Sequence, residues 1–142
     1  MRMLLTKKFT FEMAHALDGY NGKCANVHGH SYHLEATVEV SVDTANNGED
    51  NSGMVIDFHT IKDIVHRSVI DRFDHALVLK AGSPCATAAV SFPNLVEIPC
   101  NPTTENLLLH FASLITSELP AGTRLHSLRL AETDTSVAEL LL

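Results

Sequence analysis

The segment His28-Gly29-His30 carries the strongest chemical signal in the sequence. Side chains two residues apart on an extended chain point to the same side, with Cα atoms roughly 6.5–7 Å apart. Both imidazoles can therefore reach one metal ion, and His15, at the end of an earlier apolar segment, is the candidate third ligand. Three histidines with an open fourth position are typical of catalytic zinc, whereas magnesium and calcium prefer oxygen ligands. The alternative is that the pair is only the polar end of a strand.

Cys24 lies four residues before His28. A thiol near a divalent cation is readily deprotonated and can then serve as a nucleophile or a general base. The alternative is a small buried residue, as for most isolated cysteines. Cys85 and Cys100 have no histidine motif nearby, and three cysteines without CxxC spacing indicate reduced thiols in a cytoplasm.

The adjacent pair Asp74-His75 is a candidate for proton transfer, because a carboxylate can orient an imidazole and raise its basicity. Neighbouring side chains do not face each other in regular structure, so this role requires a turn. Otherwise Asp74 pairs locally and His75 lies on the surface. Glu105 and Glu132 are single carboxylates, and taken alone each indicates a helix-start charge or a surface group.

The elements that must position these residues begin with two strands. From His30 to Val42, apolar and polar residues alternate, which is the period-2 pattern of a strand with one buried face. The segment Leu4 to Ala14 is a second candidate, with alternate aromatic and apolar residues on one face.

Two helices are expected further along the chain. Asn46 to Gly53 is a loop by composition, and Asp57 is a plausible N-cap of the first helix. Thr103 is a plausible cap of the second. The connection 80–101 between them has room for a short strand near Leu95 to Ile98, and residues 123–142 indicate two strands around a turn near Asp134. The order β-β-α-α-β-β predicts an α+β domain, residues 1–142, with helices on one antiparallel sheet.

The composition excludes several classes. A net charge of −7 with only ten scattered basic residues argues against nucleic-acid binding. No segment is apolar and long enough for a signal peptide or a membrane span, so a cytoplasmic location is expected. A zinc protease is disfavoured because HExxH is absent, and a zinc deaminase because PCxxC is absent.

Six blocks in order along the chain resemble the 6-pyruvoyltetrahydropterin synthase family, which includes the 6-carboxytetrahydropterin synthases. Together the blocks are far more specific than any one of them, and they cover nearly the whole chain. They are FTFEMAHAL with His15, CANVHGHSYHLEATV with Cys24, GMVIDF from Gly53, FDHALVL with Asp74, PTTEN from Pro102, and AETDTS with Glu132.

This resemblance implies a tunnelling fold, which is a four-stranded antiparallel sheet with two helices on one face. It also implies trimeric barrels formed through the sheets, two of which stack as a homohexamer with active sites at the subunit interfaces. The expected ligand of such a site is a small pterin, and the expected cofactor is Zn²⁺.

Carried over by position, the site residues implied by the resemblance fall into three groups. His15, His28 and His30 are the implied zinc ligands. Cys24 is the implied catalytic base, assisted by Asp74 and His75 of a neighbouring subunit. Glu132 is the implied anchor of the pterin's amino-pyrimidinone edge, whose two parallel donors match the two oxygens of a carboxylate. Thr103, Thr104 and Glu105 are further implied pocket residues, while Asp57 is expected to be a structural cap.

Three residues separate Cys24 from His28, which is similar to the bacterial 6-carboxytetrahydropterin synthases of queuosine biosynthesis. The expected reaction is therefore conversion of 7,8-dihydroneopterin triphosphate to 6-carboxytetrahydropterin, with release of acetaldehyde and triphosphate. Two alternatives stay open: formation of 6-pyruvoyltetrahydropterin from the same substrate, and a zinc-stabilised binding module without turnover. Two departures from the family pattern, the long 80–101 connection and Phe73 in place of leucine, bear on the pocket.

Overall fold

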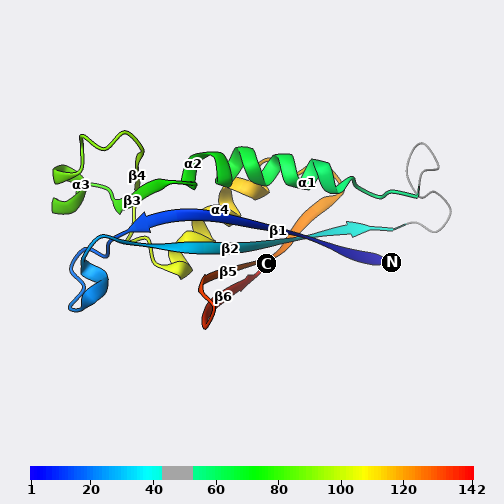
Figure 1. The fold of residues 1–142 in the computed structure, drawn as a ribbon. Coiled ribbons are helices and arrows are strands. Elements are labelled where there is room, and N and C mark those ends of the chain that lie inside the picture. Colours follow the sequence, from blue (N-terminus) through cyan, green and yellow to red (C-terminus); the bar gives the residue numbers. More distant parts are fainter. Residues whose placement is uncertain (43–52) are drawn as a thin grey trace.

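A six-stranded sheet in the order β4-β3-β1-β2-β5-β6 forms the body of the protein, seen in a computed structural model that describes residues 1–42 and 53–142 (Figure 1). The expected loop Asn46 to Gly53 lies almost wholly outside these residues. The strands are β1 (Arg2–His15), β2 (His28–Ser41), β3 (Ala76–Lys80), β4 (Leu95–Ile98), β5 (Thr123–Thr133) and β6 (Ser136–Leu141).

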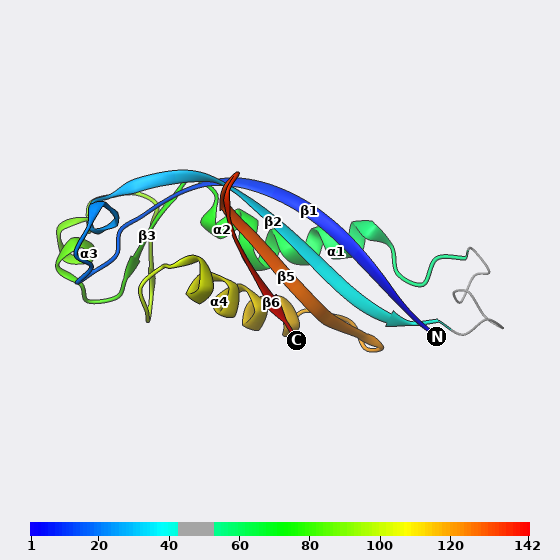
Figure 2. The same ribbon diagram turned by 90° about the horizontal axis from the view of Figure 1, so that it is seen from below.

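β1 and β2 form a long, bent antiparallel ribbon, and Figure 2 shows its curvature. Their register pairs Phe9 with Leu34 and Phe11 with Tyr32, so the apolar residues of both strands lie on one face. This face, called the helix face below, packs the main core. The other face, called the open face, carries cross-strand ion pairs from Glu35 to Lys8 at 3.3 Å and to Arg129 at 3.1 Å. The alternation expected for His30–Val42 is confirmed.

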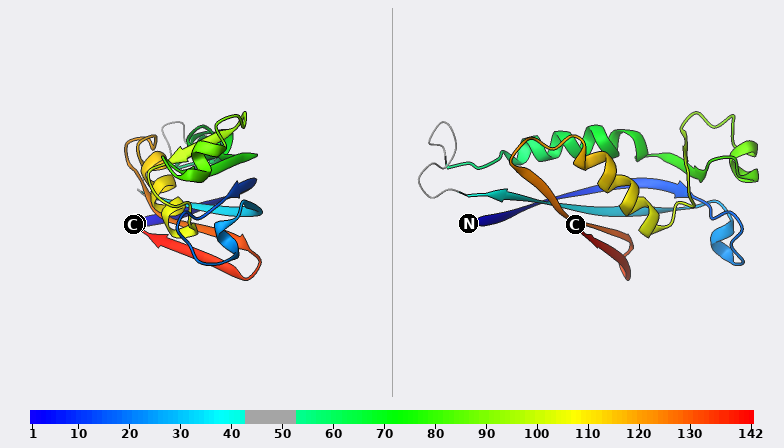
Figure 3. Two further views of the ribbon diagram at one scale, coloured as in Figure 1. Left: turned by 90° about the vertical axis from the view of Figure 1, so that its left-hand side faces the viewer. Right: turned by 180° about the vertical axis from the view of Figure 1, so that it is seen from behind.

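The helices cover the helix face (Figures 1 and 3). The first helical segment comprises α1 (Phe58–Val65), a π-helical turn η2 (His66–Ile70) and α2 (Asp71–Phe73), and Asp57 caps it by accepting from the backbone N–H of His59 at 2.8 Å. The second is α4 (Thr104–Thr116), capped by the Thr103 hydroxyl, which accepts from the Asn106 N–H at 3.3 Å. Both predicted caps are confirmed. The short elements η1 (Lys23–Ala25) and α3 (Pro84–Ala88) lie outside this layer.

The sheet has two more strands than the four that the resemblance implied, because β3 and β4 add a parallel pair beside β1, and of these two only β3 was not predicted. Ala76 and Val78 face the main core, whereas Leu77 and Leu79 pack with α3 in a second apolar cluster on the other side. A short parallel strand buried on both faces shows a continuous apolar run instead of alternation, so it is easily missed in a sequence. The predicted strand at Leu95–Ile98 is confirmed as β4.

The remaining four strands, β1, β2, β5 and β6, are antiparallel with helices on one face, as expected. β5 and β6 flank the predicted turn at Asp134. Among the described residues, no helix combines the length and the apolar character needed to cross a membrane.

Candidate metal and catalytic site

Three histidines meet at one end of the β1–β2 ribbon. His15 pairs directly with His28 across the two strands, and His30 lies opposite Met13 two residues further along β2. All three therefore project from the helix face. Gly29 separates the two β2 histidines, and a Cβ there would stand 3.2 Å from the Met13 carbonyl oxygen. A glycine thus lets the two strands approach closely between the two histidines.

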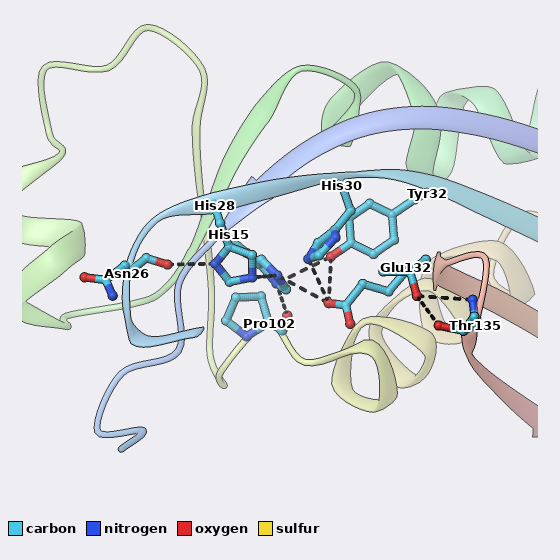
Figure 4. A network of polar contacts seen from close by, with 9 residues as sticks. His15, Asn26, His28, His30, Tyr32, Pro102, Glu132 and Thr135 are labelled. Atoms are coloured by element: carbon cyan, nitrogen blue, oxygen red, sulfur yellow. Dashed lines mark hydrogen bonds and ion pairs between the residues drawn. The ribbon is translucent and has the colours of Figure 1, made fainter. Parts of the chain in front are cut away.

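Carbonyl groups fix the orientation of two of the rings (Figure 4). His15 Nδ1 lies 2.8 Å from the Pro102 carbonyl oxygen, and His28 Nδ1 lies 2.7 Å from that of Asn26. A carbonyl oxygen can only accept, so both Nδ1 atoms carry the proton and both Nε2 atoms keep a lone pair. Such second contacts orient histidine ligands in metal sites.

The Nε2 lone pairs of His15 and His28 face each other at 3.1 Å. Tetrahedral zinc, with nitrogen ligands at roughly 2.0–2.1 Å, holds two such atoms roughly 3.3–3.4 Å apart. His30 Nε2 is buried and has no hydrogen-bond partner in the described part of the chain. One ligand atom from each histidine lies within 4.8 Å of the others. This donor set fits a metal ion, and the cluster could hold one.

Burial favours the form of His15 that binds metal. The side chain is only 2% exposed, and desolvation is the largest cause that lowers its pKa below 6.5, although the hydrogen bond to Pro102 opposes this. The neighbouring His28 lowers the pKa further. His15 is therefore neutral at neutral pH, as metal ligation requires.

Glu132, near the end of β5, lies against this cluster. Its Oε1 is 3.3 Å from His15 Nε2 and 3.4 Å from His30 Nε2. The fully buried Tyr32 donates its hydroxyl to the same oxygen at 3.4 Å, and burial is the main cause that raises the pKa of Tyr32. Glu132 was expected at the pterin ring. The structure places one of its oxygens beside the Nε2 atoms of His15 and His30.

Cys24 lies in η1, on the loop between β1 and β2, and is partly buried. Its backbone carbonyl accepts from the N–H of Leu17 at 2.9 Å, which ties the loop to the end of β1. The thiol does not belong to the group of ligand atoms within 4.8 Å, which contains histidines alone. Cys24 therefore places a thiol on the loop that leads into β2, outside the group of three histidines.

Asp74 and His75 do face each other, because the chain turns sharply between α2 and β3. The Asp74 Oδ1 to His75 Nδ1 distance is 3.0 Å, and His75 has a φ of 59°, in the left-handed region. Such a conformation costs a non-glycine residue about 1–3 kcal/mol and is often found at functional sites. Glu12 holds the turn: its N–H donates to Asp74 Oδ1 at 2.9 Å, and its carbonyl accepts from the His75 N–H at 2.6 Å.

The Glu12 N–H is the largest cause that lowers the pKa of Asp74 below 3.8. Asp74 is therefore ionised at neutral pH and able to orient the His75 ring. The His75 side chain is 76% exposed, at a depression that it shares with Glu12, Gly29, His30 and Ser31. Glu12 and Ser31 alternate in sequence with the buried residues of their strands, so this depression opens on the open face.

The PTTEN block lies against the histidine cluster, through the Pro102 carbonyl. Asn101 positions it, because its side chain both accepts from the Asp18 N–H and donates to the Asp18 carbonyl, each at 2.9 Å. Thr103 caps α4, Thr104 is partly buried, and Glu105 is exposed in the first turn.

Sequence reasoning missed Tyr32, Pro102 and Asn26 as parts of this site. Tyr32 could have been found, since it follows His30 by two residues on the same strand face. Pro102 and Asn26 act through backbone carbonyls, which leave no signal in the side-chain pattern.

A family model described as 6-pyruvoyl tetrahydropterin synthase matches residues 4–141. A curated 6-carboxy-5,6,7,8-tetrahydropterin synthase of Haemophilus influenzae is 47% identical over 74 residues, 52% of this chain and 50% of that protein. A protein of the same name from Rickettsia felis is 31% identical over 140 residues, 95% of this chain and 97% of that protein. The solved 6-pyruvoyl tetrahydropterin synthase of Caenorhabditis elegans matches with a TM-score of 0.70 at 22% identity, over 99% of this chain and 96% of the other.

The chain therefore belongs to the 6-pyruvoyl tetrahydropterin synthase family. The predicted resemblance and the tunnelling fold are confirmed, and so is the prediction of a lyase-type enzyme similar to 6-carboxytetrahydropterin synthases.

Proposed function

We propose that this protein is a zinc-dependent lyase that converts 7,8-dihydroneopterin triphosphate and one water molecule to 6-carboxy-5,6,7,8-tetrahydropterin, acetaldehyde and triphosphate. The observation that carries the proposal is the convergence of three histidines, with two Nδ1–H groups held by carbonyls and the Nε2 lone pairs turned inward. The names of the full-length relatives support the choice of product. The pathway we propose is the biosynthesis of queuosine and related 7-deazapurines.

His15, His28 and His30 hold the zinc ion in this proposal, and neutral imidazoles with an open position suit a catalytic site. Bound zinc supplies Lewis-acid polarisation of hydroxyl groups on the substrate's side chain. Cys24, as a thiolate, removes the proton from the adjacent side-chain carbon. The carbonyls of Pro102 and Asn26 keep the two ligand rings from rotating.

His75 moves the second proton, and the ionised Asp74 keeps its imidazole oriented. The pair lies toward the open face, while the histidine cluster lies on the helix face of the same chain. We therefore propose that Asp74 and His75 serve the metal site of a neighbouring chain, in a homohexamer built as a dimer of trimers. An active site shared between chains would then form at each interface.

Glu132 and Glu105 are the carboxylates we propose for recognition of the pterin's N–H groups, with Thr103 and Thr104 as further pocket residues. A carboxylate accepting two parallel N–H donors forms a strong and geometrically selective contact. Glu132 is nearer to the histidines and Glu105 is more exposed, so a substrate bound to the metal would meet Glu132 first.

Product analysis tests this function. Incubation of the purified protein with 7,8-dihydroneopterin triphosphate should release acetaldehyde and triphosphate, with a pterin that retains one side-chain carbon. The Cys24→Ala variant is the matched control and should yield neither product. A pterin with an intact three-carbon side chain and no acetaldehyde would replace the proposal by 6-pyruvoyltetrahydropterin formation. No turnover of either kind, with zinc bound, would favour a binding module.

A further inference from the structure

A second polar site lies between the π-helical turn η2 and α4, away from the histidine cluster. The residues around this groove are Arg67, Ser68, Arg72, Leu114, Ser117 and Glu118. Leu114 stands ten residues beyond Thr104, the first residue of α4, which is roughly 15 Å along the helix at 1.5 Å per residue. The groove is therefore separate from the site that contains His15.

The π-helical turn brings the two arginines to the same groove. In this turn the Asp71 N–H donates to the carbonyl of His66, five residues earlier. The wider turn aligns residues five apart, so Arg67 and Arg72 both reach the groove. π-Helical turns are uncommon and are frequently found at functional sites.

Two buried polar atoms beside the groove lack a partner. In residues 1–42 and 53–142, the buried side-chain atoms without a hydrogen bond are His30 Nε2, Ser68 Oγ, His110 Nε2 and His126 Nδ1. The first belongs to the candidate metal site, and an unpaired buried polar atom in a native structure calls for an explanation such as a bound ion or ligand. Ser68 is in the groove wall. His110 lies four residues before Leu114 on α4, and its ring packs 5.9 Å from that of Phe73, centroid to centroid.

The charges at the groove favour an anion. Arg72 has no carboxylate partner among the described residues, and its guanidinium stands 5.6 Å from the centre of the Phe73 ring. Arg67 pairs only with Glu118, at 3.5 Å between side chains that are 59% and 50% exposed. Exposed pairs of this kind contribute about 0–1 kcal/mol, so a ligand can displace Glu118. Desolvation first, and then Arg72, lowers the pKa of His110, so its ring is neutral at neutral pH.

We propose that the groove between η2 and α4 binds a small phosphate-bearing anion. Guanidinium groups bind phosphate in a bidentate manner, and the hydroxyl of Ser68, which lines the groove, is a further donor. The groove volume of about 340 Å³ is at the lower end for ligand pockets, which suits inorganic phosphate or a small phosphate monoester. The site is independent of the function proposed above.

Titration followed by ¹H–¹⁵N NMR tests this site, with inorganic phosphate and glycerol 3-phosphate as separate probes at constant ionic strength. Saturable shifts should appear at Ser68, Arg72 and His110. The Arg72→Gln variant should weaken binding roughly tenfold or more, because a charge-assisted contact is lost. Ser68→Ala should weaken it by a smaller factor. Tighter binding of the ester would identify a phosphorylated metabolite, and equal binding would identify free phosphate.

Arg2→Gln is the matched control, since Arg2 is an exposed arginine on β1 that does not line the groove and pairs with Glu39 at 3.4 Å. It should leave the affinity at the groove unchanged. Equal losses in Arg2→Gln and Arg72→Gln would show general charge screening and overturn the proposal. Shifts at the groove that do not saturate, or that chloride alone produces, would overturn it as well.

Discussion

The two faces of the sheet at its histidine end differ in how they hold their functional groups. On the helix face, His15, His28 and His30 are partly or fully buried and converge on one point. Toward the open face, Asp74 and His75 form a pair whose imidazole is mostly exposed. The ligand atoms of the first arrangement lie within 4.8 Å of one another, whereas the His75 ring does not belong to that group. Within one chain, the two halves of the proposed chemistry are therefore two separate groups of side chains.

The physical causes that determine the protonation states of His15 and Asp74 also differ. Desolvation lowers the pKa of His15 and keeps it neutral for metal binding. A backbone N–H from Glu12 lowers the pKa of Asp74 and keeps it charged for pairing with His75. Burial therefore sets the protonation state of His15 in the histidine cluster, and the hydrogen bond from the Glu12 N–H sets that of Asp74 in the Asp74–His75 pair.

The largest effect is expected on the helix face. His28→Ala should remove most of the bound zinc and abolish turnover, because two histidines alone do not complete the ligand set. Zinc is measured by mass spectrometry of the purified protein, with about one ion per chain expected in the wild type. Cys24→Ala is the matched control and should keep its zinc while losing turnover. Full zinc occupancy in His28→Ala would refute the ligand assignment.

On the other face, His75→Ala should lower kcat by about 10²–10⁴-fold, the usual contribution of a general acid or base. Zinc content should be that of the wild type, because the His75 ring is 76% exposed and does not belong to the group of three histidines. Steady-state kinetics and metal analysis on the same preparation check both points. Loss of zinc in this variant would show that His75 contributes to metal binding, and would contradict the assignment of separate roles to the two faces.

The sequence predicted the helix face better than the open face. Period-2 spacing placed His28 and His30 on one side of β2, and strand pairing then required His15 to lie opposite His28. Backbone geometry was harder to anticipate. The left-handed φ of His75 and the two Glu12 hydrogen bonds have no signature in residue type. The strand β3 was not predicted, because a short apolar run does not reveal its partner, whereas β4 matches the short strand predicted at Leu95–Ile98.

A smaller effect is expected for the pterin contact. Glu132→Gln exchanges an acceptor for a donor and should weaken pterin binding by roughly 2–4 kcal/mol, measured by calorimetry. Glu105→Gln is the comparison and should have a smaller effect. Zinc should be retained in both, because the three histidines complete the ligand set. An unchanged dissociation constant in Glu132→Gln, with a loss of zinc, would make Glu132 a fourth ligand.

The smallest effect concerns stability on the open face. The pKa of Asp74 is lowered below 3.8 in the folded state, so the unfolded chain binds its proton first as the pH falls. This stabilisation is complete above pH 3.8 and is lost as the pH falls through the folded-state pKa. In Asp74→Asn, the free energy of unfolding should therefore decrease less steeply below pH 3.8 than in the wild type. Urea unfolding at several pH values measures the difference, and parallel curves would contradict it.

Complementation between inactive chains tests most directly whether the two faces act in one site across a chain boundary. His28→Ala and His75→Ala chains, each with a different tag, are co-expressed and the mixed oligomers are isolated through both tags. If each site joins a histidine cluster from one chain to an Asp74–His75 pair from its neighbour, random mixing should restore roughly a quarter of the sites. Each variant alone should be inactive. Mixed oligomers that remain as inactive as the separate variants would show that each chain must supply both halves, and would contradict the account.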